Sequence, residues 1–355
     1  MSTTMRDVAD RAGVSVKTVS NVVNDFPHVR ASTRERVLRA IDELGYQMNF
    51  TARSLSLGRT GMLTLAVPKL RLPYFAELAD EVIGAAEARG YTVLIEQTGG
   101  SRAREIELLT SERRRMTDGL ILSPSGLQSG DAPQLEAGSP VVLLGERSLH
   151  ARVHHVVMPN EAGARAVTEH LLATGRRRIA LLGYTPGDGE GAGHLRARGF
   201  RAALAAAGVE HDEARTVAVP EWTLAAGAQA MRTLLDRGAQ VDAVLGLNDV
   251  LALGAMRVLF ERGLAVPHDV AVAGFDDIEE SRFARPSLTT VRPDRAQIAR
   301  RAVDLLVDGL GRGRSGDGAL GDAADAVDAP ATAPDPDAPH VADFSLQVRE
   351  STARP

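Results

Sequence analysis

The chain has 355 residues, 44% of them hydrophobic, and its formal net charge is −5 at pH 7. It has no cysteine, which excludes disulfides and cysteine-ligated metal sites. It has neither an apolar signal segment at its start nor a run approaching the roughly 20 apolar residues that span a membrane. We therefore expect a soluble, cytoplasmic protein of two or three domains.

The first elements predicted along the chain are two short helices joined by a glycine turn. Gly13 permits a tight reversal, and Ser15 can cap the second helix. Both helices carry apolar residues at helical spacing that would pack against one another, namely Val8, Ala9, Ala12, Val19, Val22 and Val23. The pattern predicts a helix-turn-helix.

A third helix would complete a small all-α head. Ser32 and Glu35 have the spacing of a capping box, and Gly45 would end the helix. Its apolar face would consist of Val37, Leu38, Ile41 and Leu44. Residues 1–60 contain nine Lys or Arg against six Asp or Glu, so this part is mildly basic while the rest of the chain is acidic.

The second helix would present its polar side to DNA, because its valines occupy the opposite side. A cation, hydroxyls, an amide and methyl groups match the groups that a major groove displays. The DNA-contacting residues predicted here are Ser15, Val16, Lys17, Thr18, Ser20, Asn21 and Asn24. Further cations that favour DNA binding stand at Arg30, Arg34, Arg53 and Arg59. The alternative is a helical hairpin with no DNA partner.

From Gly61 onward, short apolar runs alternate with helical stretches. The runs begin at Met62, Tyr91, Gly119, Val141, Arg178, Thr216, Ala243 and Val270. Helices are expected near residues 75–90, 161–174, 195–207, 223–237 and 248–262. Continuous apolar runs between helices predict an α/β fold with parallel sheets covered on both faces. Ligands of such sheets bind at the carboxyl ends of the strands.

Several polar side chains near these strand ends suit a small ligand with hydroxyl groups. Arg196 offers a planar fork of donors, and Asn248 and Asp276 each directly follow a strand. Ser123 follows another strand and is a weaker candidate. The alternatives are a surface cation for Arg196, helix caps for Asn248 and Asp276, and an ordinary loop serine for Ser123.

Three aromatic residues could form walls of the same site. Tyr74, Phe75 and Trp222 offer faces on which a sugar ring or a purine could stack. For Trp222, core packing is an equally good interpretation.

Enzymatic and cofactor signals are weak. Gly187, Gly189 and Ala192 fit a dinucleotide fingerprint, but the loop is rich in glycine throughout and the next acidic residue at a strand end, Glu221, comes too late. The histidines are scattered, and His154 and His155 are expected to precede a strand. We expect no catalysis, no metal and no cofactor.

Several motifs in a fixed order resemble the lactose/galactose repressor (LacI/GalR) family of bacterial transcription factors. Besides the head, they are the segment from Gly45 to Val67, the GFDD run from Gly274 to Asp277, PSLTTV from Pro286 to Val291, and VREST near the C-terminus. The similarity runs from Met5 to about Arg312 and again from Phe344 to Thr352.

The resemblance implies a two-lobed effector domain of the periplasmic-binding-protein type I class behind the head. It implies a homodimer that reads a pseudo-palindromic operator and binds a small effector in the cleft between the lobes. The effector residues named above match family contact positions. By the same resemblance, Tyr46, Asn49, Ala52 and Leu55 are DNA contacts, with Leu55 wedging into the minor groove.

The expected domain organisation starts with a head at 1–48 and a hinge at 49–60. The first lobe would comprise 61–158 and 291–312, and the second 159–290 and 341–355. Residues 313–340 form an insertion: residues 315–339 are almost entirely Ala, Asp, Pro and Gly, with six acids and no base, which predicts disorder. No leucine heptads follow, so we expect no tetramerising tail.

The function predicted from these features is a repressor of a carbohydrate-utilisation operon that responds to a sugar. A purine effector is the alternative within the same class. Less favoured are a solute-binding protein, which would not need the head, and an enzyme that uses the cleft.

Overall fold

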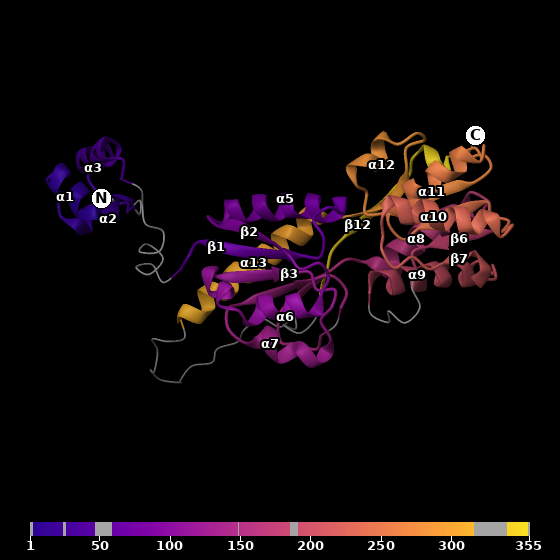
Figure 1. The fold of residues 1–355 in the computed structure, drawn as a ribbon, viewed down its shortest axis with the longest axis horizontal. Helices are drawn as coiled ribbons and strands as arrows, with labels where there is room; N and C mark the ends of the chain where they lie inside the picture. Colours follow the sequence, from indigo (N-terminus) through magenta and orange to yellow (C-terminus); the bar gives the residue numbers. More distant parts are fainter. Residues whose placement is uncertain are drawn as a thin grey trace, which may run out of the picture. The chain divides into compact units, whose positions relative to one another are not determined.

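The structure is a computed structural model, and it describes residues 3–23, 26–46, 59–147, 149–184, 191–315 and 339–353, without the side chains of 311–315. The chain divides into two compact units, Met1–Thr60 and Gly61–Pro355, which we describe separately (Figure 1). Among the residues predicted to bind DNA, Asn24, Asn49, Ala52, Arg53 and Leu55 lie outside the described residues. So does nearly all of the insertion.

The first unit is a three-helix head made of α1 (Met5–Ala12), α2 (Val16–Val23) and α3 (Ala31–Leu44). Thr4 and Asp7 form a capping box at the start of α1, and Gly13 ends that helix in the left-handed conformation, with φ +63°. The Ser15 hydroxyl accepts a hydrogen bond from the backbone N–H of Thr18 at 3.1 Å, as expected of a cap. The core of the head consists of small apolar residues, namely Val8, Ala9, Ala12, Val19, Val22, Val37 and Ala40.

Two predictions about α3 are wrong. The helix begins at Ala31, so Ser32 lies inside its first turn and cannot cap it, and no side chain caps its start. Leu38 is 47% exposed, because the buried positions Val37 and Ala40 define a face from which Leu38 points away. Gly45 does end the helix, with φ +57°.

The second unit contains two six-stranded sheets, each the centre of one lobe. The first sheet has the order β11-β5-β4-β3-β1-β2, with strands at His340–Val341, His154–Val157, Val141–Leu144, Gly119–Leu122, Met62–Val67 and Thr92–Gln97. The second has the order β12-β10-β9-β8-β6-β7, with strands at Phe344–Gln347, Thr289–Pro293, Ala271–Phe275, Ala243–Gly246, Ile179–Leu182 and Thr216–Val217. The strands are parallel except β12, which pairs antiparallel with β10.

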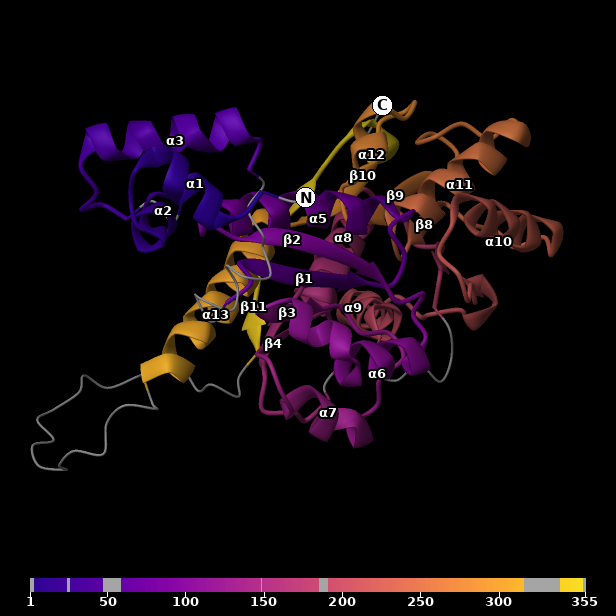
Figure 2. The same cartoon turned by 60° about the vertical axis from the view of Figure 1, so that its left-hand side comes forward.

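Helices cover both faces of each sheet, because the apolar strands are buried on both sides. In the first lobe, α5 (Pro73–Ala88) and α13 (Arg295–Ser315) share one core, while α6 (Arg102–Thr110) and α7 (Ala132–Glu136) cover the other face. In the second lobe, α8 (Asn160–Ala173) and α9 (Ala192–Ala206) pack on one face. Figure 2 shows α10 (Leu224–Asp236) and α11 (Asp249–Glu261) side by side on the other.

The chain crosses between the lobes at places that differ slightly from expectation. Residues 291–293 belong to β10 of the second sheet, although they were expected in the first lobe, because this strand continues to Pro293. Residue 341 was expected in the second lobe but lies in β11, which adds to β5 of the first sheet. His154 and His155 lie within β5 and do not precede it. Strand β7 contains only Thr216–Val217, so it is shorter than the apolar run that begins at Thr216 and from which a strand was predicted.

We searched the helices that the structure describes for possible membrane spans. None of them combines the length and apolar character needed to cross a bilayer.

Candidate functional site

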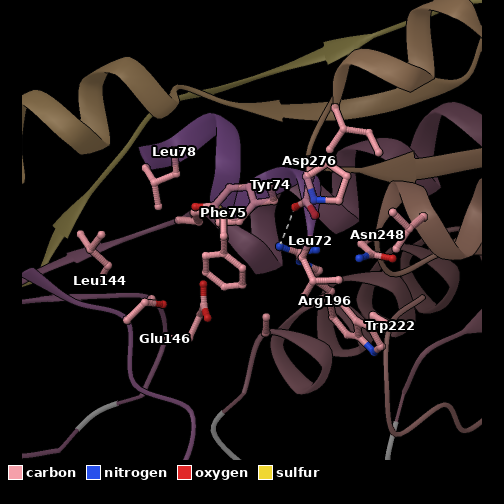
Figure 3. Close-up of a pocket in the computed structure, with 17 residues that line it drawn as sticks. Leu72, Tyr74, Phe75, Leu78, Leu144, Glu146, Arg196, Trp222, Asn248 and Asp276 are labelled. Carbon is pink, nitrogen blue, oxygen red and sulfur yellow. Dashed lines mark hydrogen bonds and ion pairs between the residues drawn. The ribbon is translucent and has the colours of Figure 1, made fainter. Parts of the chain in front are cut away.

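The candidate site is a cavity of about 140 Å³ between the two lobes, at the carboxyl ends of their strands. Figure 3 shows residues of the first lobe facing residues of the second across it. Every residue predicted at the effector site lines this cavity: Tyr74, Phe75, Ser123, Arg196, Trp222, Asn248 and Asp276. Their contact with an effector stays a prediction.

Arg196 forms the centre of the second lobe's side of the cavity. It lies on α9 and is only 2% exposed, so it is not a surface cation. Its Nε donates to Asn160 Oδ1 at 2.6 Å, its Nη1 to the Leu247 carbonyl at 2.5 Å, and its Nη2 to Asp276 Oδ1 at 3.1 Å. The guanidinium also lies over the ring of Phe275, 3.7 Å from its centroid. These contacts use three of the five N–H groups that an arginine offers.

Asp276 follows β9 in a backbone conformation that residues other than glycine rarely adopt. Its φ is +107°, and the next residue, Asp277, has φ +49°. Burial raises the pKa of Asp276 to about 6, and the neighbouring Arg196 opposes that increase. A carboxylate held this way can accept hydrogen bonds from ligand hydroxyls while it remains paired with Arg196.

Asn248 and Trp222 each have the structural role that was the alternative interpretation, and each also lines the cavity. Asn248 caps α11, because its Oδ1 accepts from the backbone N–H of Leu251 at 3.0 Å. Trp222 donates from Nε1 to the Gly183 carbonyl at 3.1 Å and packs against both cores of the second lobe. One side chain can therefore serve packing and recognition together.

The first lobe contributes an aromatic pair. Tyr74 and Phe75, at the start of α5, have ring centroids 5.2 Å apart in an edge-on arrangement. Burial raises the pKa of the Tyr74 hydroxyl, which is thus a neutral donor near the carboxyl groups of Asp276 and Glu146. These rings supply apolar surface opposite the polar groups of the second lobe.

Sequence reasoning missed Glu146 and Asn160. Glu146 follows β4 and lines the cavity, and its Oε1 accepts from Asn160 Nδ2 at 2.5 Å. Burial raises the pKa of Glu146, with Arg196 opposing. Because Glu146 stands just after a predicted strand, the strand-end argument could have found it. Asn160, which joins Glu146 to Arg196 across the lobes, gave no signal in the sequence.

A wider outer cavity of about 420 Å³ continues from the inner one, sharing Phe75, Glu146 and Trp222 among its walls. Charged residues of both lobes meet here. Lys69 Nζ lies 3.0 Å from Glu221 Oε1, and Arg71 lies 3.4 Å from Glu221 Oε2. Of the dinucleotide fingerprint, Gly187 and Gly189 fall outside the described residues, and Ala192 begins α9.

The chemistry of the site is that of binding. Paired carboxylates, amides and a guanidinium can read hydroxyl groups, and aromatic faces can cover the apolar face of a ring. Within the described residues, no group of three or more His, Asp or Glu side chains could hold a metal ion.

The predicted DNA-reading residues of the head differ in their surroundings. Ser15, Val16 and Lys17 are exposed, whereas Thr18, Ser20 and Asn21 are half-buried. Tyr46 packs partly against the head core.

Arg34, expected to favour DNA binding, is engaged within the head. It donates to the carbonyl oxygens of Phe26, at 2.9 Å, and of Val22.

Comparisons with known proteins match both units. The family described as bacterial regulatory proteins, lacI family, matches residues 4–49, and a periplasmic binding protein-like domain matches residues 168–322. The HTH-type transcriptional regulator CelR of Thermobifida fusca is 40% identical over 315 residues, covering 86% of this chain and 91% of that protein.

Two solved structures extend the likeness over nearly the whole chain. A complex of the transcriptional regulator CelR with cellobiose is 34% identical, with a TM-score of 0.68, and covers 98% of this chain and 99% of that one. The lac repressor dimer bound to operator and the anti-inducer ONPF is 28% identical, with a TM-score of 0.81 and full coverage of both chains. The chain belongs to the LacI family of bacterial regulatory proteins, which are transcriptional regulators and not enzymes.

Proposed function

We propose that the protein represses a carbohydrate-utilisation operon and that a sugar bound in the cavity between the lobes controls it. The observation that carries the proposal is a series of hydrogen-bonded polar side chains from Glu146 through Asn160 and Arg196 to Asp276, which faces Tyr74 and Phe75. Such a chain offers donors and acceptors to hydroxyls beside an apolar wall. The cellobiose complex of CelR supports the same ligand class.

DNA binding is assigned to the head. We place Lys17, Asn21 and their neighbours on α2 in the major groove of the operator. Asn49, Ala52 and Leu55 of the segment 49–60 would contact the operator centre, and residues 1–48 would form the reading domain. A regulator of transcription acts on the chromosome, so we place the protein in the cytoplasm.

A second copy of the chain would complete the functional unit, because a pseudo-palindromic operator needs two heads. Strand β2 is the outer strand of its sheet and exposes Leu94 and Ile95. Met116 lines the same surface pocket as Leu94 and is 61% exposed. In the second lobe, Phe283 is 77% exposed. Exposed apolar side chains on both lobes suit a dimer interface, and the related lac repressor structure is a dimer.

Control by the effector follows from the position of the cavity. A ligand that contacts both lobes favours one angle between them over another, and this couples its binding free energy to the affinity for operator.

The test measures operator binding by the purified protein across a ligand panel. Operator DNA is first selected from a random pool, and affinity is then measured with cellobiose, glucose, galactose, ribose, guanine and hypoxanthine. We expect a sugar to change the operator affinity. A response to a purine alone would replace the sugar with the alternative effector class, and turnover of any ligand would contradict a pure binding role.

A further inference from the structure

An ion pair of the first lobe lies beside the turn that carries Asp276. Glu77 belongs to α5, and Arg295 is the first residue of α13, two helices that share the core of the first lobe. Arg295 Nη2 lies 2.6 Å from Glu77 Oε2, and the side chains are 14% and 27% exposed. This partial shielding from water strengthens the attraction compared with a fully exposed pair.

Both members of the pair also bind main-chain groups of the second lobe. Arg295 donates from Nη1 to the carbonyl oxygen of Asp276 and from Nη2 to that of Asp277, the latter at 3.2 Å. Glu77 Oε1 accepts from the backbone N–H of Glu279 at 2.9 Å. The two side chains thus hold residues 276–279, which join β9 to α12 (Glu279–Phe283).

The turn needs such support because its backbone is strained. Positive φ values at residues other than glycine, as at Asp276 and Asp277, are unfavourable and persist only where the surroundings enforce them. Arg196 binds the Asp276 side chain from within the cavity, whereas Arg295 binds the Asp276 carbonyl from the first lobe. One residue is therefore held at the same time by the cavity and by the opposite lobe.

We propose that Glu77 and Arg295 are positioning residues that couple effector binding at Asp276 to the placement of the first lobe against the second. This inference rests on the proposed function, because it takes the cavity as the effector site. A ligand that draws the Asp276 carboxylate displaces the turn, and the displaced carbonyls and the Glu279 N–H change their contacts with Arg295 and Glu77. The lobe that carries these residues leads directly along the chain to the head, so its placement affects operator binding.

The test compares Arg295→Ala and Glu77→Gln with two matched controls. Arg300→Ala and Glu81→Gln change exposed residues of the same helices, α13 and α5. The measured quantity is the ratio of operator Kd values with and without saturating cellobiose. Saturation removes the effect of any loss in cellobiose affinity, so a role limited to folding or ligand affinity would leave the ratio unchanged.

We expect the ratio to move toward 1 by at least about fivefold in both test variants, the lower end of typical allosteric coupling, and to stay at the wild-type value in the controls. Wild-type ratios in both test variants would overturn the proposal.

If cellobiose does not affect the wild-type protein, cellobiose is not the effector, and the link is tested with operator DNA alone. Operator binding should then change hydrogen exchange at the Glu279 amide in the wild type but not in Arg295→Ala. No change at residues 276–279 of the wild type would refute the coupling.

Discussion

Gly274 and Asp249 approach so closely that a β-carbon on Gly274 would lie 2.2 Å from Asp249 Oδ1. The carboxylate cannot move aside easily. Its Oδ1 accepts from the Thr290 hydroxyl at 2.5 Å, and its Oδ2 accepts from the Ser281 hydroxyl at 2.7 Å. The glycine of the GFDD run therefore makes room for a buried carboxylate directly behind the turn that carries Asp276.

Replacing this glycine should destabilise the second unit. For Gly274→Ala we expect the free energy of unfolding to fall by about 1–3 kcal/mol, the usual effect of overpacking. Gly309→Ala is the matched control, because a β-carbon there meets no atom within 4 Å and alanine favours the helix α13. Urea unfolding of the two variants measures the difference, and equal stabilities would show that the close approach is harmless.

Stability should also depend on pH through the buried carboxyl groups. Burial raises the pKa of Asp249 to about 8 and that of Asp276 to about 6, from an ordinary value of 3.8. Between about pH 4 and pH 8 these two groups bind more protons in the folded protein than in the unfolded chain, so their contribution to the free energy of unfolding should fall as the pH rises through this range. Urea unfolding at several pH values measures this slope.

Asp249→Asn should reduce that slope, because it removes the group with the higher pKa. The exposed Asp80 on α5 provides the control variant, Asp80→Asn, which should keep the wild-type slope. A wild-type slope in Asp249→Asn would assign the pH dependence to other groups.

The cavity residues were predictable because parallel strands end at a common edge. Ser123, Asn248 and Asp276 were identified as residues that follow apolar runs, and they do meet at one cavity. The sequence could not show that Arg196 is buried, because its burial depends on Asn160 and the Leu247 carbonyl, which come from distant parts of the chain. A local pattern carries no information about such partners.

Errors in the predicted elements have the same origin. Ser32 and Glu35 have the spacing of a capping box, but spacing does not fix where a helix starts, and α3 begins one residue before Ser32. Strands β11 and β12 are short and follow a segment without apolar pattern. The sequence predicted the second lobe for both, which is correct for β12, whereas β11 joins the sheet of the first lobe. When only pairing fixes the position of a strand, that position cannot be predicted until the partner strand is known.

Substitutions at Arg196 and Asp276 should separate effector binding from DNA binding. Arg196→Ala removes the donors from three buried acceptors, and Asp276→Asn removes the charge that pairs with Arg196. Each should weaken binding of a responsive sugar by at least about tenfold, or roughly 1.4 kcal/mol. The head does not include these residues, so operator affinity without sugar should be retained. Calorimetric titration and an operator-binding assay check the two parts, and wild-type sugar affinity in both variants would move the ligand elsewhere.

Lys17 and Asn21 should determine which operator sequence is read. Lys17 is exposed on α2 and Asn21 is half-buried one turn later, so both can reach the same groove. A good base contact contributes about 1–3 kcal/mol of discrimination, so Lys17→Ala and Asn21→Ala should each relax the preference at particular base pairs in selection from a random pool. Arg39→Ala on α3 is the control, since it removes an exposed cation from another helix of the head. If the two test variants weaken binding equally to every sequence, Lys17 and Asn21 contact phosphates and do not read the bases.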